Sequence, residues 1–218
     1  IEIPDLTSIT KLRFLVLRSF KSMIHLPAVD TDRLELIDVA ESDFLKSIQV
    51  KARRLRSLVA DGCTGLEIVD LRDCPNLVKL SLARVSNVQE IRGLVENHSL
   101  QDIQISDAPK LTHLDGLETN FEIRSLTLVN CPELIKLPNW RRLIQMTRLK
   151  IYSCEKLESL PNIPLPSLEA LLLGGCDAMK QLVSFDLFPN LKILRWSSFT
   201  GEEEVIDISS FVALPPKI

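Results

Sequence analysis

The amino-acid sequence predicts a strand-dominated solenoid of the α/β type, in which short repeats stack into a curved rod. Leucine or another apolar residue recurs in the frame L-x-x-L-x-L-x-x-C/A/V, which begins at Leu12, Leu34, Leu55, Leu77, Leu100, Ile123, Met146, Leu168 and Leu191. Successive starts lie 21 to 23 residues apart, the length of one strand plus one return segment in a leucine-rich repeat. Because one unit cannot bury its apolar face alone, the units are expected to stack into a horseshoe with one continuous core.

Each frame start opens a predicted strand. The nine expected strands are Leu12–Leu17, Leu34–Val39, Leu55–Ala60, Leu77–Leu82, Leu100–Ile105, Ile123–Leu128, Met146–Ile151, Leu168–Leu173 and Leu191–Trp196. Alternation within L-x-L directs the aliphatic side chains inward and frame positions three, five and seven outward. We therefore expect a parallel sheet along the concave side.

The return segments predict a mostly irregular convex side with little helix. Several carry an x-x-L-x-x-L-P motif, as in residues 132–138 and 155–161. Proline fixes φ and removes a backbone donor, so these segments should be extended or turn-like. Between residues 55 and 91 the leucine pattern doubles to a spacing of 11, which predicts one convex strand at Leu66–Leu71.

The unbroken register predicts a single domain over residues 1–218. About nine repeats would occupy residues 12–198, with residues 1–11 as the remnant of a preceding repeat. Residues 199–218 would form a C-terminal tail or partial cap, with one further strand at 205–208. The N-terminus lacks the order of a signal peptide, and no apolar run approaches the roughly 18 residues of a membrane span.

Five cysteines recur in the repeat register. Four lie eight residues after a frame start, at Cys63, Cys131, Cys154 and Cys176, and Cys74 lies eight residues after Leu66. This shared inward position predicts buried, reduced thiols, because free cysteine packs as a small hydrophobe. The absence of a C-x-x-C pair argues against zinc and disulfides and favours a cytoplasmic, reducing compartment.

Composition and motifs favour recognition over catalysis. A net charge of −3 argues against binding to a nucleic-acid backbone, which usually requires a basic excess. The chain has no glycine-rich phosphate loop, and His25, His98 and His113 stand alone. We therefore expect no enzymatic activity, no cofactor and no metal.

The outward positions of the sheet carry the candidate binding residues. Tyrosine and arginine beside an apolar residue are typical of binding hot spots, and this combination occurs at Arg148, Lys150, Tyr152, Leu172 and Arg195. A second apolar patch comprises Phe14, Val16 and Leu36, which form either a contact surface or an interface with preceding repeats. The loop around Trp140 is a further alternative.

Two cysteine-led units resemble those of a known family. Residues 131–138 and 154–161 resemble the C-x-x-L-x-x-L-P units in the leucine-rich-repeat domains of plant intracellular nucleotide-binding immune receptors. Residues 154–176 resemble the TIR-type branch, although the doubled section departs from its common pattern. The resemblance implies that the domain senses a pathogen effector or a host protein and restrains a nucleotide-binding switch elsewhere in its own full-length chain.

Two alternatives stay open. The repeats could instead recognise substrates for an F-box-type ubiquitin ligase, which an F-box preceding residue 1 would favour. A small enzyme built on a solenoid would need clustered outward acids or histidines on adjacent strands, and the sequence predicts none.

Overall fold

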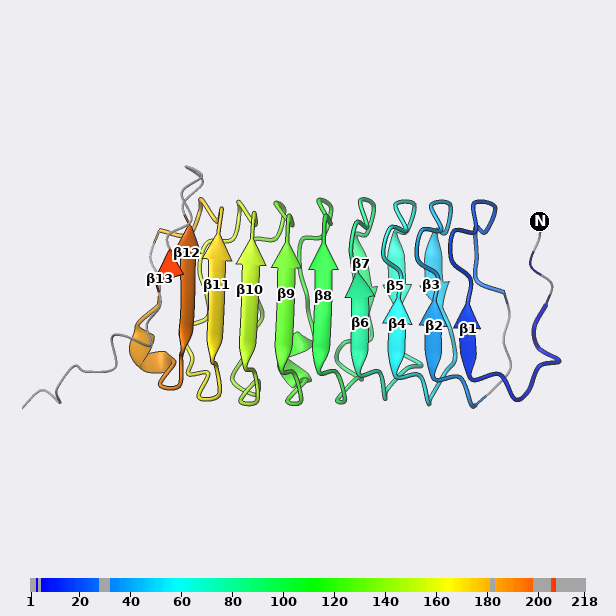
Figure 1. Ribbon diagram of the computed structural model, residues 1–218, viewed down its shortest axis with the longest axis horizontal. Coiled ribbons are helices and arrows are strands. Elements are labelled where there is room, and N and C mark those ends of the chain that lie inside the picture. Colours follow the sequence, from blue (N-terminus) through cyan, green and yellow to red (C-terminus); the bar gives the residue numbers. More distant parts are fainter. Residues whose placement is uncertain (1–2, 4, 28–31, 181–182, 198–204, 207–218) are drawn as a thin grey trace, which may run out of the picture.

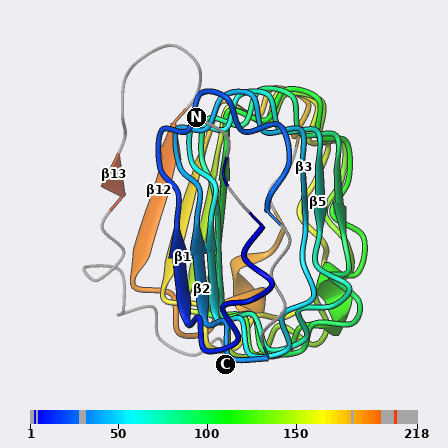
Figure 2. The same cartoon turned by 90° about the vertical axis from the view of Figure 1, so that its right-hand side faces the viewer.

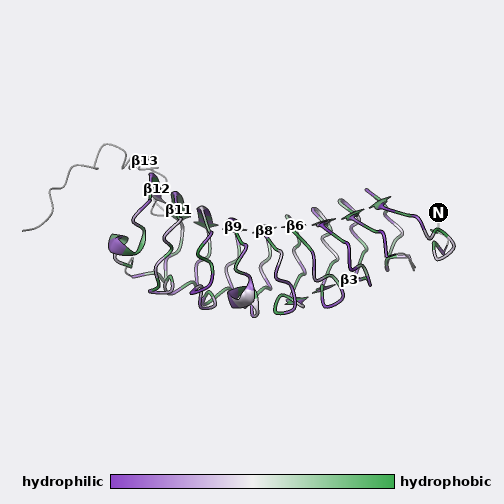
Figure 3. Cartoon of the chain, turned by 90° about the horizontal axis from the view of Figure 1, so that it is seen from below, coloured by the Kyte–Doolittle hydropathy of each residue, from purple (hydrophilic) through white to green (hydrophobic). Residues whose placement is uncertain are grey.

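The computed structural model describes residues 3, 5–27, 32–180, 183–197 and 205–206 as an elongated stack of coils (Figure 1). The stack curves, and its larger sheet follows the inner side of the curve (Figure 3). The predicted strand-dominated solenoid with a concave parallel sheet is therefore confirmed.

The concave sheet contains nine parallel strands among the described residues, in the order β1-β2-β4-β6-β8-β9-β10-β11-β12. Their bounds are β1 Phe14–Val16, β2 Leu36–Asp38, β4 Ser57–Val59, β6 Lys79–Leu82, β8 Asp102–Ser106, β9 Ser125–Val129, β10 Arg148–Tyr152, β11 Ala170–Gly174 and β12 Ile193–Ser197. Frame positions pair with one another along the whole sheet, as in Phe14↔Leu36 and Arg148↔Ala170. The register predicted from the leucine period is thus confirmed.

The core is a column of aliphatic side chains at frame position four. Its members are at most 5% exposed and comprise Leu15, Ile37, Leu58, Leu80, Ile103, Leu126, Leu149, Leu171 and Leu194. Position six adds a second inward row up to Leu173, which is also buried. Trp196 continues that row but is 38% exposed, because it lies in the last coil of the larger sheet.

The strands begin two residues later than predicted. The first leucine of each frame closes a turn instead: the amide of Leu55 donates to the carbonyl of Ala52 (3.0 Å), and that of Leu168 to Leu165 (3.1 Å). Since these amides are consumed in the turn, the first frame position is buried but cannot join the strand ladder. The predicted strand starts were therefore wrong, although the facing of the side chains was right.

A turn with a left-handed residue follows each concave strand. Frame position eight has positive φ in every coil from Ser19 (58°) to Gly175 (59°), including Glu41, Gly62, Arg84, Asp107, Asn130 and Ser153. This conformation redirects the chain toward the convex side and places the next residue, often a cysteine, in the core. Because only glycine, asparagine and aspartate favour it, the other residues here carry some backbone strain.

The convex side carries a small parallel sheet that the sequence predicted only in part. It consists of β3 Ser47–Gln49, β5 Ile68–Asp70 and β7 Glu90–Arg92, opposite the concave sheet in the view along the stack (Figure 2). The predicted strand at Leu66–Leu71 corresponds to β5, whereas β3 and β7 were missed. Helix in the described residues is limited to two 3-10 turns, η1 Leu117–Thr119 and η2 Phe185–Leu187, as expected for return segments of this kind.

A short strand, β13 Val205–Ile206, pairs antiparallel with β12 through Leu194↔Ile206. It lies within the stretch where the sequence predicted one further strand, but its direction shows that it is not another repeat. The rest of the predicted tail, at 199–204 and 207–218, lies outside the described residues. No helix within the described ranges is long and apolar enough to cross a membrane.

Candidate protein-binding surface

The predicted concave residues lie together on β10, β11 and β12. Lys150 pairs in register with Leu172, which pairs with Arg195. Arg148 and Tyr152 are two residues before and after Lys150 on β10, so all three point to the same side of the sheet. We call these five residues the concave patch. With neighbouring strands about 4.8 Å apart, the patch forms one continuous surface.

Tyr152, at the end of β10, is packed against neighbouring residues of the sheet. The ammonium of Lys150 lies 5.4 Å from the centroid of the Tyr152 ring, a cation–π contact. The ring also lies against Gly174: a Cβ added there would meet the Cδ1 and Cε1 atoms of Tyr152 at 2.8 Å. Glycine at this position therefore leaves space for the ring.

The concave patch is positively charged. Among the described residues of β9 to β12, no outward position of the sheet carries an acid, whereas Arg148, Lys150 and Arg195 all face outward. Acids lie at outward positions of other strands, at Asp38, Asp61 and Asp102, and Asp102 on β8 is exposed without an ion pair among the described residues. Asp38 is buried against the guanidinium of Arg18 (2.6 Å), and Asp61 accepts a hydrogen bond from the Ser81 hydroxyl (2.8 Å). The positive charge of the sheet is therefore concentrated in the concave patch.

The second predicted patch is also on the concave face. Phe14 and Val16 are each 55% exposed, and Leu36 pairs with Phe14 and is half-buried. Arg13 lies over the Phe14 ring at 5.2 Å. Side chains of this patch point off the face of the sheet, and both interpretations of it, contact surface or interface with preceding repeats, remain predictions.

Trp140 is a core residue, so the loop around it, the further candidate, presents its other side chains to solvent. Its side chain is 1% exposed, and its indole N–H donates to the carbonyl of Ile163 (3.1 Å) in the next coil. The return segment buries its aromatic ring where a leucine usually packs, and exposes the flanking Arg141 and Arg142. His25 and His113 are exposed.

The cysteines line the core side of the turns. All five are free, four are buried, and Cys176 is half-buried. Cys63 donates to the carbonyl of Val39 in the preceding coil (3.1 Å), whereas Cys131 and Cys154 approach carbonyls of their own coils at 3.6 Å. No group of three or more His, Cys, Asp or Glu residues that could hold a metal occurs in the described part of the chain.

Burial shifts the ionisation of most of these thiols. It raises the pKa of Cys63, Cys74 and Cys176 to about 11. A hydrogen bond between Cys131 and Cys154 raises the pKa of the Cys154 thiol, together with burial, and lowers that of Cys131. Because the Cys131 side chain is fully buried, it is nevertheless closed to reagents in solution.

A groove at the edge where the strands begin was not predicted. It has a volume of about 810 Å³ and is lined by Glu35, Arg54, Arg56, Asn76, Val78, His98, Ser99, Gln101, Phe121 and Glu122. The lining residues come from five coils and precede the strands. Alternation within a strand therefore does not predict which way their side chains face. The only signal in the sequence was the basic run Lys51, Arg53, Arg54 and Arg56.

Comparisons with known proteins identify the fold. No protein-family model matches the sequence, and no curated protein sequence matches it. The leucine-rich repeat domain of the type III effector XopL is similar, with a TM-score of 0.58 and 18% identity over 81% of this chain and 74% of the XopL chain. A functional domain of InlJ from Listeria monocytogenes, described as including a cysteine ladder, has a TM-score of 0.49 and 16% identity, over 95% of this chain and 53% of the InlJ chain. The chain therefore has the fold of a leucine-rich repeat domain.

Proposed function

We propose that this chain is a non-catalytic recognition module that binds a protein through the concave patch. The observation that carries the proposal is a continuous surface that combines three cations with a tyrosine, with no outward acid among the described residues of β9 to β12. Arginine and tyrosine contribute disproportionately to binding energy when a partner buries them. Complementary charge adds specificity and speeds encounter, so the partner should present an acidic surface.

We further propose that the module belongs to a plant intracellular immune receptor, acts in the cytoplasm, and senses a pathogen effector or a host protein. The two cysteine-led units support this, because Cys131, Leu134, Cys154 and Leu157 are all buried, as a repeat register requires. The test is the transcript upstream of residue 1. A nucleotide-binding switch domain would support the assignment, and an F-box would overturn it.

The binding proposal is tested by affinity capture with matched baits. The Arg148→Glu/Arg195→Glu double variant reverses the charge of the concave patch. The Lys136→Glu/Arg142→Glu variant makes the same change in charge at exposed positions in a return segment. We expect proteins captured by the wild type to be lost with the first bait and retained with the second. Identical capture by all three baits would show that the concave patch is not the site.

A further inference from the structure

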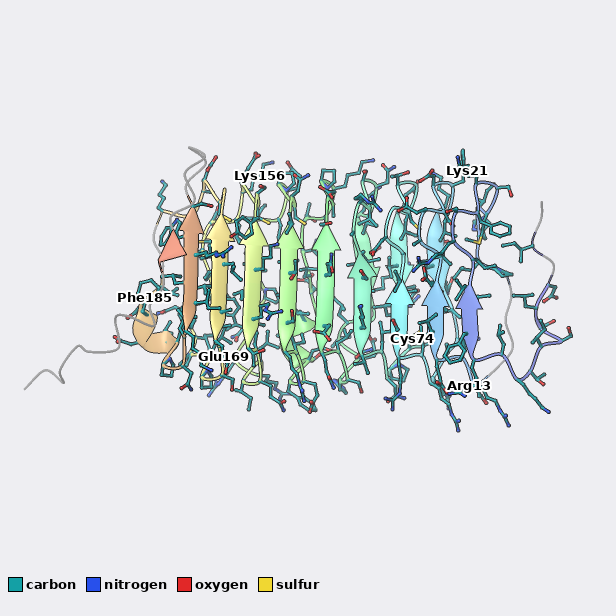
Figure 4. All side chains as sticks on the ribbon, in the orientation of Figure 1. Arg13, Lys21, Cys74, Lys156, Glu169 and Phe185 are labelled. Carbon is teal, nitrogen blue, oxygen red and sulfur yellow. The ribbon has the colours of Figure 1, made fainter. Side chains whose placement is uncertain are left out.

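The groove along the edge of the concave sheet has an unneutralised basic end. Glu35 lies in its wall, but the Glu35 carboxylate accepts two hydrogen bonds from Arg13, from Nε at 3.0 Å and from the terminal nitrogen at 2.9 Å. This contact, with further attraction from Arg56 and Arg54, lowers the pKa of Glu35. In the part of the chain that the structure describes, Arg54 and Arg56 form no ion pair of their own. Arg13, which is labelled at this edge in Figure 4, is thus paired with Glu35. Arg54 and Arg56 line the groove.

The opposite end of the groove is aromatic. His98 and Phe121 stack with ring centroids 6.3 Å apart and an angle of 20° between planes, and Phe121 is 43% exposed. Glu122 adjoins this end, and the half-buried Val78 lies in the wall between the two ends. The groove therefore has an order: a cationic end, an apolar wall, and an aromatic platform beside an acid that would repel a second carboxylate.

The dimensions fit an extended peptide. Arg56 precedes β4 and Phe121 precedes β9, which lie three strand spacings apart in the sheet. At about 4.8 Å per spacing this is roughly 14 Å, the length of about four extended residues. A site for a small molecule buries most of its ligand, whereas this groove runs across the outer edge of several coils.

We propose that the groove binds an extended peptide segment of a protein partner, with an acidic side chain on Arg54 and Arg56 and an aromatic side chain about four residues away on His98 and Phe121. Guanidinium groups pair strongly with carboxylates. Offset stacking of aromatic rings contributes additional binding energy beyond the buried area. This site is separate from the concave patch and does not depend on it.

The test is fluorescence anisotropy with a labelled octapeptide that carries two aspartates and, four positions later, a phenylalanine, in a serine background. One control peptide has asparagines for the aspartates, and another brings the phenylalanine next to the aspartates. We expect both controls to bind about tenfold more weakly or worse, because each loses one end of the groove. Equal binding of the three peptides would overturn the proposal, as would displacement of the octapeptide by a mononucleotide, which would indicate a nucleotide site instead.

Protein variants locate the binding. Arg54→Gln/Arg56→Gln should weaken the octapeptide about tenfold and abolish its advantage over the asparagine control. Phe121→Ala should weaken it about threefold to tenfold. Arg148→Gln/Arg195→Gln on the concave patch should leave it unchanged, so this proposal and the preceding one can fail separately. Circular dichroism must show each variant folded, and groove variants that bind as wild type would overturn the assignment.

Discussion

Leu149→Ala should destabilise the protein through a cavity in the central column of the core. Leu149 lies on β10 and is fully buried, and its register neighbours are Leu126 on β9 and Leu171 on β11. Both neighbours are at most 1% exposed. The strands on either side are held by backbone ladders, so the two flanking leucines cannot move together to fill the space.

The magnitude follows from the burial. Replacing leucine by alanine removes roughly three carbon atoms from the core, and each buried methylene is worth about 0.8 kcal/mol. The unfilled cavity adds to this, and buried leucine-to-alanine changes cost roughly 2 to 5 kcal/mol. Because the strands on both sides prevent the cavity from closing, we expect the free energy of unfolding to fall by about 3 to 4 kcal/mol.

Urea unfolding followed by circular dichroism measures the loss, with Lys150→Ala as the matched control one residue along the same strand. Lys150 faces outward, so its replacement removes only its contact with Tyr152 and should cost less than about 1 kcal/mol. A larger loss for Lys150→Ala than for Leu149→Ala would refute the assigned facing of β10. A loss below about 1 kcal/mol for Leu149→Ala would refute the packed column.

Three other outcomes follow from the structure. In native protein the five cysteines should react slowly with a thiol reagent and rapidly in denaturant, and native labelling of Cys131 at the denatured rate would contradict its burial. A hydrogen bond from Arg72 lowers the pKa of the Asp70 carboxyl. The ionised carboxylate of Asp70 therefore stabilises the fold above about pH 4, the pKa of aspartate in the unfolded chain. The stability advantage of wild type over Asp70→Asn should therefore be constant near pH 7 and shrink as the pH falls from about 4 toward 2; an unchanged difference would count against the pair. Ser153→Gly should stabilise by roughly 0.5 to 1 kcal/mol because Ser153 has a φ of 53°, whereas Ser99→Gly, away from any left-handed turn, should destabilise.

The repeat period was sufficient to predict the concave sheet and its register. Side chains alternate within a strand, so one inward leucine sets the facing of its neighbours. Stacking then aligns the same position in every coil, from Leu15 to Leu194. The strand starts were misplaced because a leucine pattern reports burial alone, and a leucine such as Leu55 can be buried while its amide closes a turn.

The convex strands and the left-handed turns were harder to predict for a different reason. Leu45 and Ile48, like Val88 and Ile91, have the same spacing as Leu66 and Val69 of the convex strand that was predicted, and all are buried. Leu45 lies 11 residues after Leu34 and Val88 lies 11 residues after Leu77, but only Leu55, Leu66 and Leu77 form an unbroken run of leucines at that spacing, so only the central strand was predicted. The turn position was hidden because its residue varies from glycine to arginine, so composition does not mark it.

The structure adds most to the sequence by showing which charged side chains are paired with each other. Arg18 and Arg195 occupy outward positions of the same sheet and look equivalent along the chain. Arg18 is engaged by Asp38 from the neighbouring coil, whereas Arg195 has no ion pair within the described residues. Asp38 lies 20 residues from Arg18, close to the length of one coil, so the acid that neutralises a cation can be distant in the sequence. Local motifs therefore predict which side chains face outward, but the ion pairs seen in the structure separate a neutralised arginine from one that can bind a partner.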